Sequence, residues 1–174
     1  NRKYTYRIVF IPETIGSIAY ISKNLKKLKQ NVIAGYNITC VGDNNTYSYL
    51  PSRNENTFAD KVALNILNSI DPNFKKYTWL DRGSDERQYC APGVDLPVVT
   101  LCRSKFVEYP EYHTSLDNLD FISAQGLQSS FELFKKIIEN IEINEFPKNL
   151  FLCEPHLSKY SLYPTLGGKN NSEN

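Results

Sequence analysis

The sequence has no methionine at all, and only two histidines and four cysteines among its 174 residues. A chain without an initiator methionine is expected to be a fragment or a processed piece of a longer protein. The cysteines are too few and too irregularly spaced for the disulfide framework of a small secreted domain. Three of them stand among apolar residues, which suits reduced thiols and favours a cytoplasmic setting. The four are Cys40, Cys90, Cys102 and Cys153.

An excess of one charge and a long hydrophobic run are also missing. The formal net charge is +1. Lys23, Lys26, Lys27 and Lys29 fall on the polar side of a predicted helix, which indicates a solvated face rather than a nucleic-acid groove. No apolar run reaches the roughly 18 residues that span a bilayer, and no charged-then-apolar leader opens the chain. We therefore predict no nucleic-acid partner and no membrane span, while the oligomeric state stays unknown.

The hydrophobic pattern that is present predicts a layered α/β fold. The chain is 41% hydrophobic, enough for one sizeable core. Apolar residues in β-branched and aromatic runs predict strands, and apolar residues at helical spacing predict helices. The predicted strands cover 4–11, 31–43, 46–50, 74–80 and 96–102, and the predicted helices cover 18–30, 57–71 and 121–143. Strands alternating with helices favour a three-layer α/β/α domain with a mostly parallel or mixed sheet.

Particular residues support the helix and domain predictions. Thr57 and Asp60 have the spacing of a capping box, with Asp71-Pro72 as the stop. The last helix follows the apolar series Leu127, Phe131, Phe134, Ile138 and Ile141. We expect one domain over residues 1–146, lacking its N-terminal side, and an irregular strap with a flexible tail over residues 147–174.

Three polar stretches are predicted to meet at one edge of this sheet. Glu13 directly follows the first strand, the pair Asp85 and Glu86 precedes the strand at 96–102, and His113 follows that strand. Carboxylates and an imidazole converging at strand ends suit a hydrolytic metal site. Each also has an ordinary structural interpretation. Glu13 can favour a helix N-terminus, the acidic pair can be a solvated loop, and the His113 segment can be a helix entrance capped by Ser115 or Asp117.

Several motifs together carry a family resemblance. The order "GSDERQYCAPGVDLPVV" (83–99), then "EYHTSLDNLD" (111–120), resembles the closing half of the M28-type zinc aminopeptidases. "PETIGS" (12–17) and "AGYNITCVG" (34–42) fit preceding strand ends of that family. The sequence is most similar to the uncharacterised aminopeptidase-like DUF4910 group, over about residues 4–140.

The resemblance implies roles for matching positions. Glu13 corresponds to the general base that activates water, and His113 to a zinc ligand. Asp85 corresponds to an acid beside the metal centre, and Asp117 to a residue that ties the loop after His113 to the helix start. Glu86 stands where many relatives have histidine.

Three positions have no such match. Tyr112 flanks His113 without an assigned role. Thr14 and Thr39 occupy positions where co-catalytic relatives have metal-binding carboxylates, and neutral hydroxyls hold zinc poorly. The upstream histidine ligand and bridging aspartate of the family have no counterpart here, so one or two zinc ions are expected only in the full-length form.

Three functions remain open at this point. The first is a zinc-dependent aminopeptidase-like hydrolase acting on a small peptide or amide, of which this chain is an inactive fragment. The second is an inactive aminopeptidase-fold domain that binds an amine-bearing small molecule, peptide or sugar conjugate. The third is acyl transfer of the glutaminyl-cyclase kind. Whether the full-length form is an enzyme is therefore undecided, because a fold does not determine a function.

Overall fold

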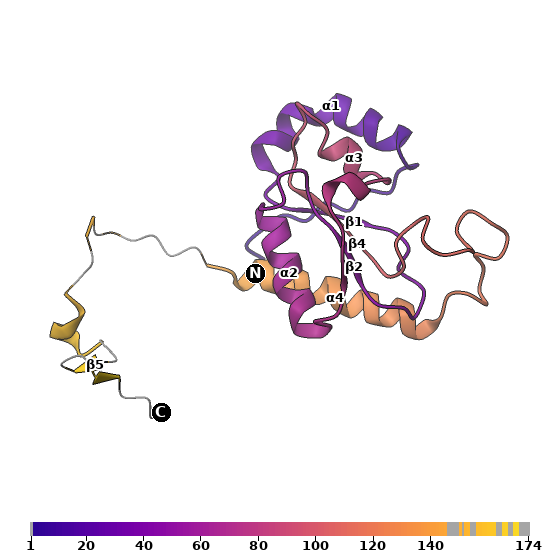
Figure 1. The fold of residues 1–174 in the computed structure, drawn as a ribbon. Helices are drawn as coiled ribbons and strands as arrows, with labels where there is room; N and C mark the ends of the chain where they lie inside the picture. The colour runs from indigo at the N-terminus through magenta and orange to yellow at the C-terminus, as the bar shows by residue number, and fades with distance from the viewer. Residues whose placement is uncertain are drawn as a thin grey trace. The chain divides into compact units, whose positions relative to one another are not determined.

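A mixed four-stranded sheet with strand order β1-β4-β2-β3 organises the chain (Figure 1). The computed structural model describes residues 2–145, 150, 152–153, 156–162, 165–166 and 169–170. The strands are β1 (Gly35–Ile38), β2 (Ser48–Leu50), β3 (Lys75–Lys76) and β4 (Val98–Cys102). β1 runs parallel to β4, β2 runs antiparallel to β4, and β2 runs parallel to β3. Every residue of β4 is buried, as expected for a central strand.

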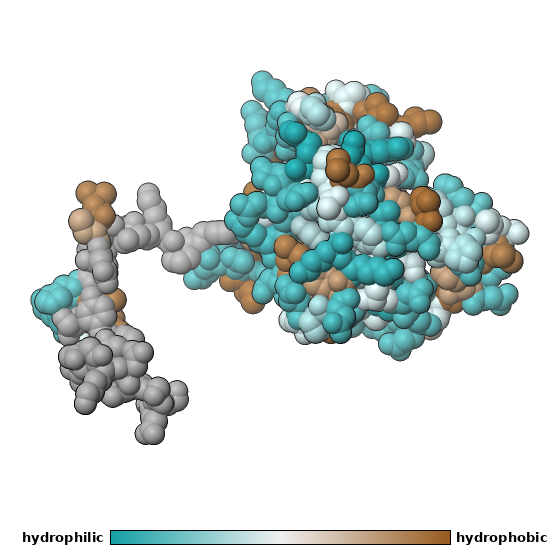
Figure 2. All heavy atoms as spheres, in the orientation of Figure 1, coloured by the Kyte–Doolittle hydropathy of each residue, from teal (hydrophilic) through white to brown (hydrophobic). Residues whose placement is uncertain are grey.

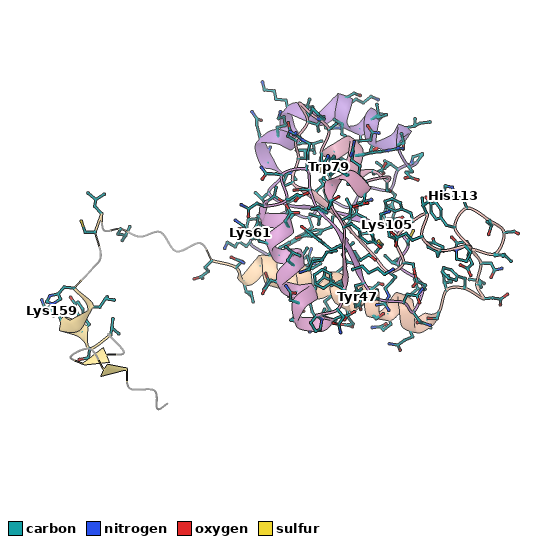
Figure 3. All side chains as sticks on the ribbon, in the orientation of Figure 1. Tyr47, Lys61, Trp79, Lys105, His113 and Lys159 are labelled. Atoms are coloured by element: carbon teal, nitrogen blue, oxygen red, sulfur yellow. The ribbon has the colours of Figure 1, made fainter. Side chains whose placement is uncertain are left out.

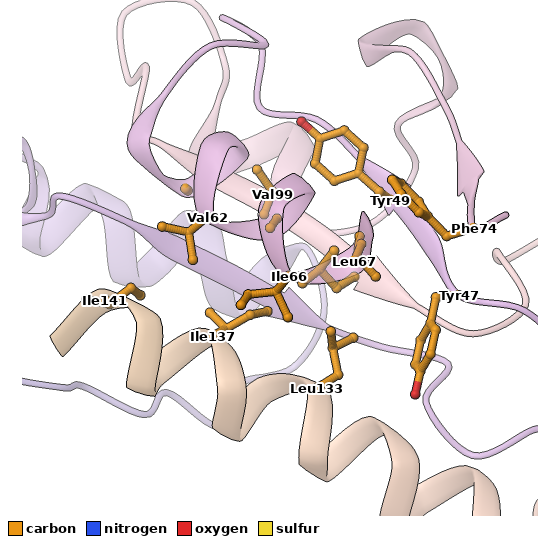
Figure 4. Close-up of a cluster of buried hydrophobic side chains, with 13 residues drawn as sticks. Tyr47, Tyr49, Val62, Ile66, Leu67, Phe74, Val99, Leu133, Ile137 and Ile141 are labelled. Atoms are coloured by element: carbon orange, nitrogen blue, oxygen red, sulfur yellow. The ribbon is translucent and has the colours of Figure 1, made fainter. Parts of the chain in front are cut away.

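Helices flank this sheet in two layers, as the sequence predicts. α2 and α4 contact each other and α2 contacts β4, whereas α1 contacts α3 on the other side of the sheet (Figure 1). The main core lies between α2, α4 and the sheet, where Leu67, Val99 and Ile137 interlock (Figure 4). The longer helices are α1 (Ile15–Asn31), α2 (Phe58–Ile70) and α4 (Ala124–Ile143), and the short ones are α3 (Glu86–Tyr89) and the 3-10 turn Trp79–Asp81. The prediction of a layered α/β fold with a mixed sheet is confirmed.

The remaining residues form a separate unit, Asn144–Asn174. Its described elements are a 3-10 turn, Leu157–Tyr160, and the antiparallel strands β5 (Thr165–Leu166) and β6 (Lys169–Asn170). The predicted boundary between residues 146 and 147 lies outside the described residues. Among the described helices, none is long and apolar enough to cross a membrane. All four cysteines are free thiols.

The predicted strand over residues 4–11 is wrong. This segment has no regular secondary structure and belongs to neither sheet, and residues Ile8 and Phe10 are 79% and 92% exposed. A strand needs a neighbouring backbone with which to exchange hydrogen bonds, and the described sheet provides none for these residues. Apolar β-branched sequence therefore indicated strand propensity here, not a paired strand. On the face shown in Figure 2, exposed apolar side chains are scattered among hydrophilic ones.

The buried face of α4 is also displaced from the apolar series noted in the sequence. Leu127, Phe131 and Ile138 are exposed, and the residues that pack inward are Gly126, Ser130, Leu133, Ile137 and Ile141. The cause is the close approach of the helix start to the loop after β1. A Cβ at position 126 would lie 2.2 Å from the Gly42 carbonyl oxygen, and the Ser130 hydroxyl donates to the Val41 carbonyl (2.8 Å). Small residues set the rotation of this helix.

The start of α2 confirms the predicted capping box. Asp60 is fully buried, and its carboxylate accepts from the Thr57 N–H (2.8 Å), the Tyr49 hydroxyl (2.7 Å) and both the N–H and hydroxyl of Ser52. Burial raises the pKa of Asp60, but hydrogen bonds from Ser52, Thr57 and Tyr49 outweigh it and leave the pKa below its ordinary value. The ionised carboxylate therefore stabilises the fold.

Replacing Asp60 by Asn is expected to lower the free energy of unfolding by about 2 kcal/mol at pH 7, because an amide nitrogen would face buried donors. The pKa is lower in the folded state than in the unfolded state. The stabilisation is therefore complete above about pH 4 and is lost as pH falls through the folded pKa. Urea unfolding from pH 7 to pH 2 should show the difference between wild type and variant shrinking in acid. A difference independent of pH would contradict the assignment.

Candidate active site at the strand ends

Four loops meet beside the carboxyl ends of β1 and β4. They are the turn before α1, the segment after β1, the loop before α3 and the long loop after β4. In that order, the four loops contain Thr14, Cys40, Asp85 and Tyr109. Hydrogen bonds connect Thr14 with Asp85 and Tyr109 with Cys40. Functional groups in open α/β sheets gather at such strand ends. The structure thus brings most of the predicted site residues into one region.

A strained turn presents Glu13 at this region. Thr14 has φ 62° and ψ −66°, and the Ile15 N–H donates to the Glu13 carbonyl (2.7 Å). This pairing across one residue is a γ-turn with positive central φ, a rare conformation for any residue and a costly one for a β-branched side chain. Backbone strain of this kind costs roughly 1–3 kcal/mol and persists only where the surroundings enforce it.

Asp85 enforces that turn from a distant part of the chain. Its Oδ1 accepts from the Thr14 N–H (2.6 Å) and from the Ser17 hydroxyl (2.9 Å) in the first turn of α1. Arg87, two residues later, donates to the Thr14 hydroxyl (2.7 Å). The "PETIGS" and "GSDERQ" motifs are therefore two halves of one clamp, which fixes the backbone that carries Glu13.

The Glu13 side chain is exposed and shares its surroundings with Tyr112. Burial raises the pKa of the Tyr112 phenol, the nearby Glu13 carboxylate and Cys40 raise it further, and Arg87 lowers it. The charges of Glu13 and Arg87 thus both act on the Tyr112 phenol. An acceptor, a cation and a phenolic donor are the groups needed to move a proton and to stabilise a developing negative charge.

Glu86 lies beneath this clamp and is fully buried. Its Oε1 accepts from the N–H groups of Gly83 (2.8 Å) and Ser84 (3.0 Å). Its Oε2 accepts from the Thr100 hydroxyl (2.6 Å) in β4 and from the Asn37 amide (3.2 Å) in β1. The carboxylate therefore ties the loop before α3 to the two parallel strands, and its four hydrogen bonds leave it little capacity for a ligand.

His113 lies in the long loop after β4 and is exposed. Its ring stacks on the Tyr112 ring, with centroids 4.0 Å apart and planes 14° from parallel, and its φ is 58°. The stacking fixes the imidazole beside Tyr112 and leaves it accessible to a ligand. Figure 3 shows His113 on this loop, away from the packed core.

The helix-entrance interpretation of this loop is wrong. α4 begins at Ala124, and Ser123 caps it by accepting from the Gly126 N–H (2.9 Å). Asp117 does not reach the helix start. It accepts from the Tyr109 hydroxyl (3.3 Å), which also lies 3.4 Å from the Cys40 sulfur. The loop therefore closes on itself and on the segment after β1, so His113 is not positioned by α4.

The donors in this region do not form a zinc site by themselves. Thr39 and Thr14 provide neutral hydroxyls, and Asp85 Oδ1 already accepts two hydrogen bonds. In the part of the chain that the structure describes, no three His, Cys, Asp or Glu side chains gather closely enough to hold a metal ion. Zinc in proteins takes at least three such ligands. His113 is the one histidine of the unit Asn1–Ile143.

Sequence reasoning missed Ser17, Cys40, Arg87 and Tyr109. Ser17 and Arg87 lie inside quoted motifs, so their place in "PETIGS" and "GSDERQ" was an available signal. Cys40 and Tyr109 had no local signal, because a hydrogen bond joins them across 69 positions of the chain. Contacts of this range follow from the parallel pairing of β1 with β4.

Replacing Thr14 by Gly and by Ala is expected to separate strain from side-chain contact. Both variants lose the hydroxyl that Arg87 contacts, but only Ala retains the cost of a Cβ at positive φ. We expect the Gly variant to unfold at higher urea concentration, with an advantage of about 1 kcal/mol. Equal stability, or a more stable Ala variant, would show that Thr14 is not strained.

Comparison with known proteins agrees with the fold. The family model described as "Domain of unknown function (DUF4910)" matches residues 1–144. A Clostridium acetobutylicum protein described as "Putative polysaccharide biosynthesis protein with aminopeptidase-like domain" is 40% identical over 167 residues. That alignment covers 95% of this chain and 38% of the relative. The chain thus spans well under half the length of the relative that it matches.

Solved structures give the same result. The crystal structure of a "putative peptidase" from Clostridium acetobutylicum superposes with a TM-score of 0.79 at 39% identity, covering 91% of this chain and 37% of that one. The aminopeptidase from Aneurinibacillus sp. strain AM-1 gives a TM-score of 0.60 at 16% identity, covering 78% and 33%. The LapA aminopeptidase of Legionella pneumophila gives 0.57 at 16%, covering 76% and 36%. At these lower identities the likeness concerns the fold.

Proposed function

The chain belongs to the DUF4910 family, and from that membership and the geometry around Glu13 we propose that it forms the carboxyl-terminal part of a peptidase-like hydrolase domain. The proposed substrate class is a peptide or a related amide with a free amine. The chain alone is then inactive, because the other part of the site lies in the longer polypeptide. The observation that carries the proposal is the Asp85 clamp, which holds the Glu13 turn in a strained conformation.

Glu13 acts as the proton carrier in this proposal. Water attacks the amide carbonyl carbon while Glu13 accepts one of its protons, and the carbon–nitrogen bond then breaks as Glu13 returns that proton to the leaving amine. Asp85 and Ser17 position the turn rather than touch the substrate. In this proposal Arg87, which contacts Thr14, and Tyr112 favour the negative charge that develops on the carbonyl oxygen.

Zinc dependence is proposed only for the longer polypeptide. His113 is exposed and held by Tyr112, so it suits a metal ligand, but among the described residues it does not belong to any group of three His, Cys, Asp or Glu side chains that could hold a metal ion. These residues do not fit a zinc ion without further ligands. For this reason no step of the proposed reaction is assigned to a metal here.

Metal analysis tests this division of the site. This chain, purified without chelator, is expected to contain well under one zinc ion per molecule by inductively coupled plasma mass spectrometry, because one imidazole binds zinc weakly. The longer polypeptide is expected to contain one or two, and its His113→Ala variant fewer. Stoichiometric zinc on this chain alone, or unchanged zinc in the variant, would contradict the split site.

A binding domain without catalysis is the second candidate. It is favoured by the hydroxyls of Thr14 and Thr39 at positions where M28-type relatives have carboxylates. In that case the longer polypeptide would bind an amine-bearing small molecule, peptide or sugar conjugate without consuming it. Product analysis after incubation with amino-acyl amides distinguishes hydrolysis, cyclisation and binding alone.

A further inference from the structure

A hollow lies beside the long loop after β4. It has a volume of about 550 Å³. The starts of β2 and β3 line it, together with residues 45–46, 103–105 and 108–111 and with Phe121. Its lining includes Arg103, Lys75 and Lys105, three cations, and two carboxylates, Glu108 and Glu111. None of these residues takes part in the proposed hydrolysis. We call this hollow the Arg103 pocket.

Arg103 is the defining group of the pocket. The residue is only 8% exposed, its Nε donates to the Asp43 carbonyl (3.1 Å), and its guanidinium lies 4.1 Å from the centre of the Tyr47 ring. Within the described residues, neither of its terminal nitrogens has a hydrogen-bond acceptor, although both belong to a side chain that lines the pocket. The guanidinium is fixed through its Nε, and the N–H groups of its two terminal nitrogens are free to donate to an external anion.

Neighbouring carboxylates do not neutralise these donors. Asp43 accepts from the N–H of Asn45 (2.8 Å) and from both the N–H and hydroxyl of Ser104 (3.0 and 3.1 Å), and its carboxylate does not bond to Arg103. Glu108 is shared by Lys75 (3.6 Å) and Lys105 (3.8 Å) and also accepts from a tyrosine hydroxyl. Glu108 is thus the ion-pair partner of both lysines, and with Glu111 counted the pocket lining keeps a net charge of +1.

The uncharged walls of the Arg103 pocket indicate what kind of group the anion is attached to. The Tyr109 and Phe121 rings stack at 5.0 Å and form an aromatic wall. Ser48, a residue only 1% exposed, also lines the pocket, and its buried hydroxyl has no hydrogen-bond partner among the described residues. Figure 3 shows Tyr47 and Lys105 where the loop leaves the sheet, with His113 farther along the same loop.

We propose that the Arg103 pocket binds a small phosphomonoester, with its phosphate on Arg103, Lys75 and Lys105 and a ring-shaped body against Tyr109 and Phe121. The cations outnumber the carboxylates of the lining by one, and a phosphate has three terminal oxygens to accept from three cations, whereas a carboxylate has two. The volume exceeds that of a phosphate group alone and lies within the usual range for small-molecule sites. The proposal concerns binding and stands independently of the proposed hydrolysis.

Calorimetric titration of the whole chain tests this proposal. The probes are glucose 6-phosphate, inorganic phosphate and glucuronate, at ionic strength kept constant with sodium chloride. We expect saturable binding of glucose 6-phosphate with a Kd below about 1 mM, and binding of the other two at least about fivefold weaker. No saturable heat, or equal binding of glucuronate, would overturn the phosphate assignment. Equal binding of inorganic phosphate would overturn the ring assignment.

Variants connect the binding to these side chains. Lys75→Gln and Lys105→Gln are each expected to weaken glucose 6-phosphate binding about 5- to 10-fold, and Arg103→Gln to abolish it. Lys61 is an exposed lysine of α2 outside the pocket lining, labelled to the left of Lys105 in Figure 3. Lys61→Gln is the matched control and should bind as the wild type does. Arg103 is buried, so Arg103→Gln can fail to fold. Lys75 is exposed, so the affinity of Lys75→Gln decides the outcome. Wild-type affinity in Lys75→Gln and Lys105→Gln would overturn the proposal.

Discussion

Replacing Glu13 by Gln in the longer polypeptide is expected to lower kcat for hydrolysis of an amino-acyl amide by about 10²- to 10⁴-fold, the usual contribution of a general base. The amide of Gln keeps the size of the side chain but cannot accept and return a proton at neutral pH. The Glu13 side chain is exposed, and the Asp85 clamp holds the backbone N–H of Thr14 rather than the Glu13 carboxylate. The fold should therefore be unaffected.

Two measurements accompany this variant. The free energy of unfolding in urea should match the wild type within about 0.5 kcal/mol, as for other surface substitutions. Glu139→Gln, an exposed residue of α4 with the same change in charge, should retain full activity. Full turnover in Glu13→Gln would remove Glu13 from the reaction. Loss of turnover in both variants would point to a general effect of charge.

Replacing Glu86 by Ala is expected to have the largest effect on stability, about 3–5 kcal/mol. The change leaves the N–H groups of Gly83 and Ser84 without their acceptor and opens a cavity between the loop before α3 and β4. Each buried donor without a partner costs about 1–3 kcal/mol, and the cavity adds to this.

Glu86→Gln gives the matched comparison. It keeps the volume and one acceptor oxygen, so it should cost about half as much as Ala, and Glu139→Ala on the exposed surface should cost almost nothing. Urea unfolding at pH 7 provides all three values. If Glu86→Ala cost no more than Glu139→Ala, the hydrogen bonds assigned to Glu86 would be wrong.

Local signals in the sequence predicted the helices and the central strand well. The Thr57–Asp60 box, the stop at Asp71 and the buried run of β4 depend on neighbours within a few residues, so a single sequence contains them. The prediction of a strand at 4–11 was wrong because strand pairing depends on a partner that the local sequence does not contain. The buried face of α4 was predicted wrongly because Gly126 and Ser130 pack against a loop more than 80 residues away in the sequence.

The candidate site was predictable as a set of motifs but not as a geometry. Glu13, Asp85 and His113 were identified from their order in the chain, whereas the bond from the Thr14 N–H to Asp85 follows only from the assembled fold. Likewise, Glu86 fits an active-site carboxylate by sequence, yet its four hydrogen bonds make it a structural group. Residue type and spacing do not reveal which carboxylates already have their donors.

The bond between Thr14 and Asp85 joins residues 71 positions apart. Closing a loop of that length costs chain entropy before any contact compensates for it. We therefore expect the strained turn at Thr14 to form late in folding, after the elements between these residues have brought Asp85 into place. In a newly made or partly unfolded chain, the backbone at Thr14 is then expected to be relaxed, so that Glu13 takes its position only in the finished tertiary structure.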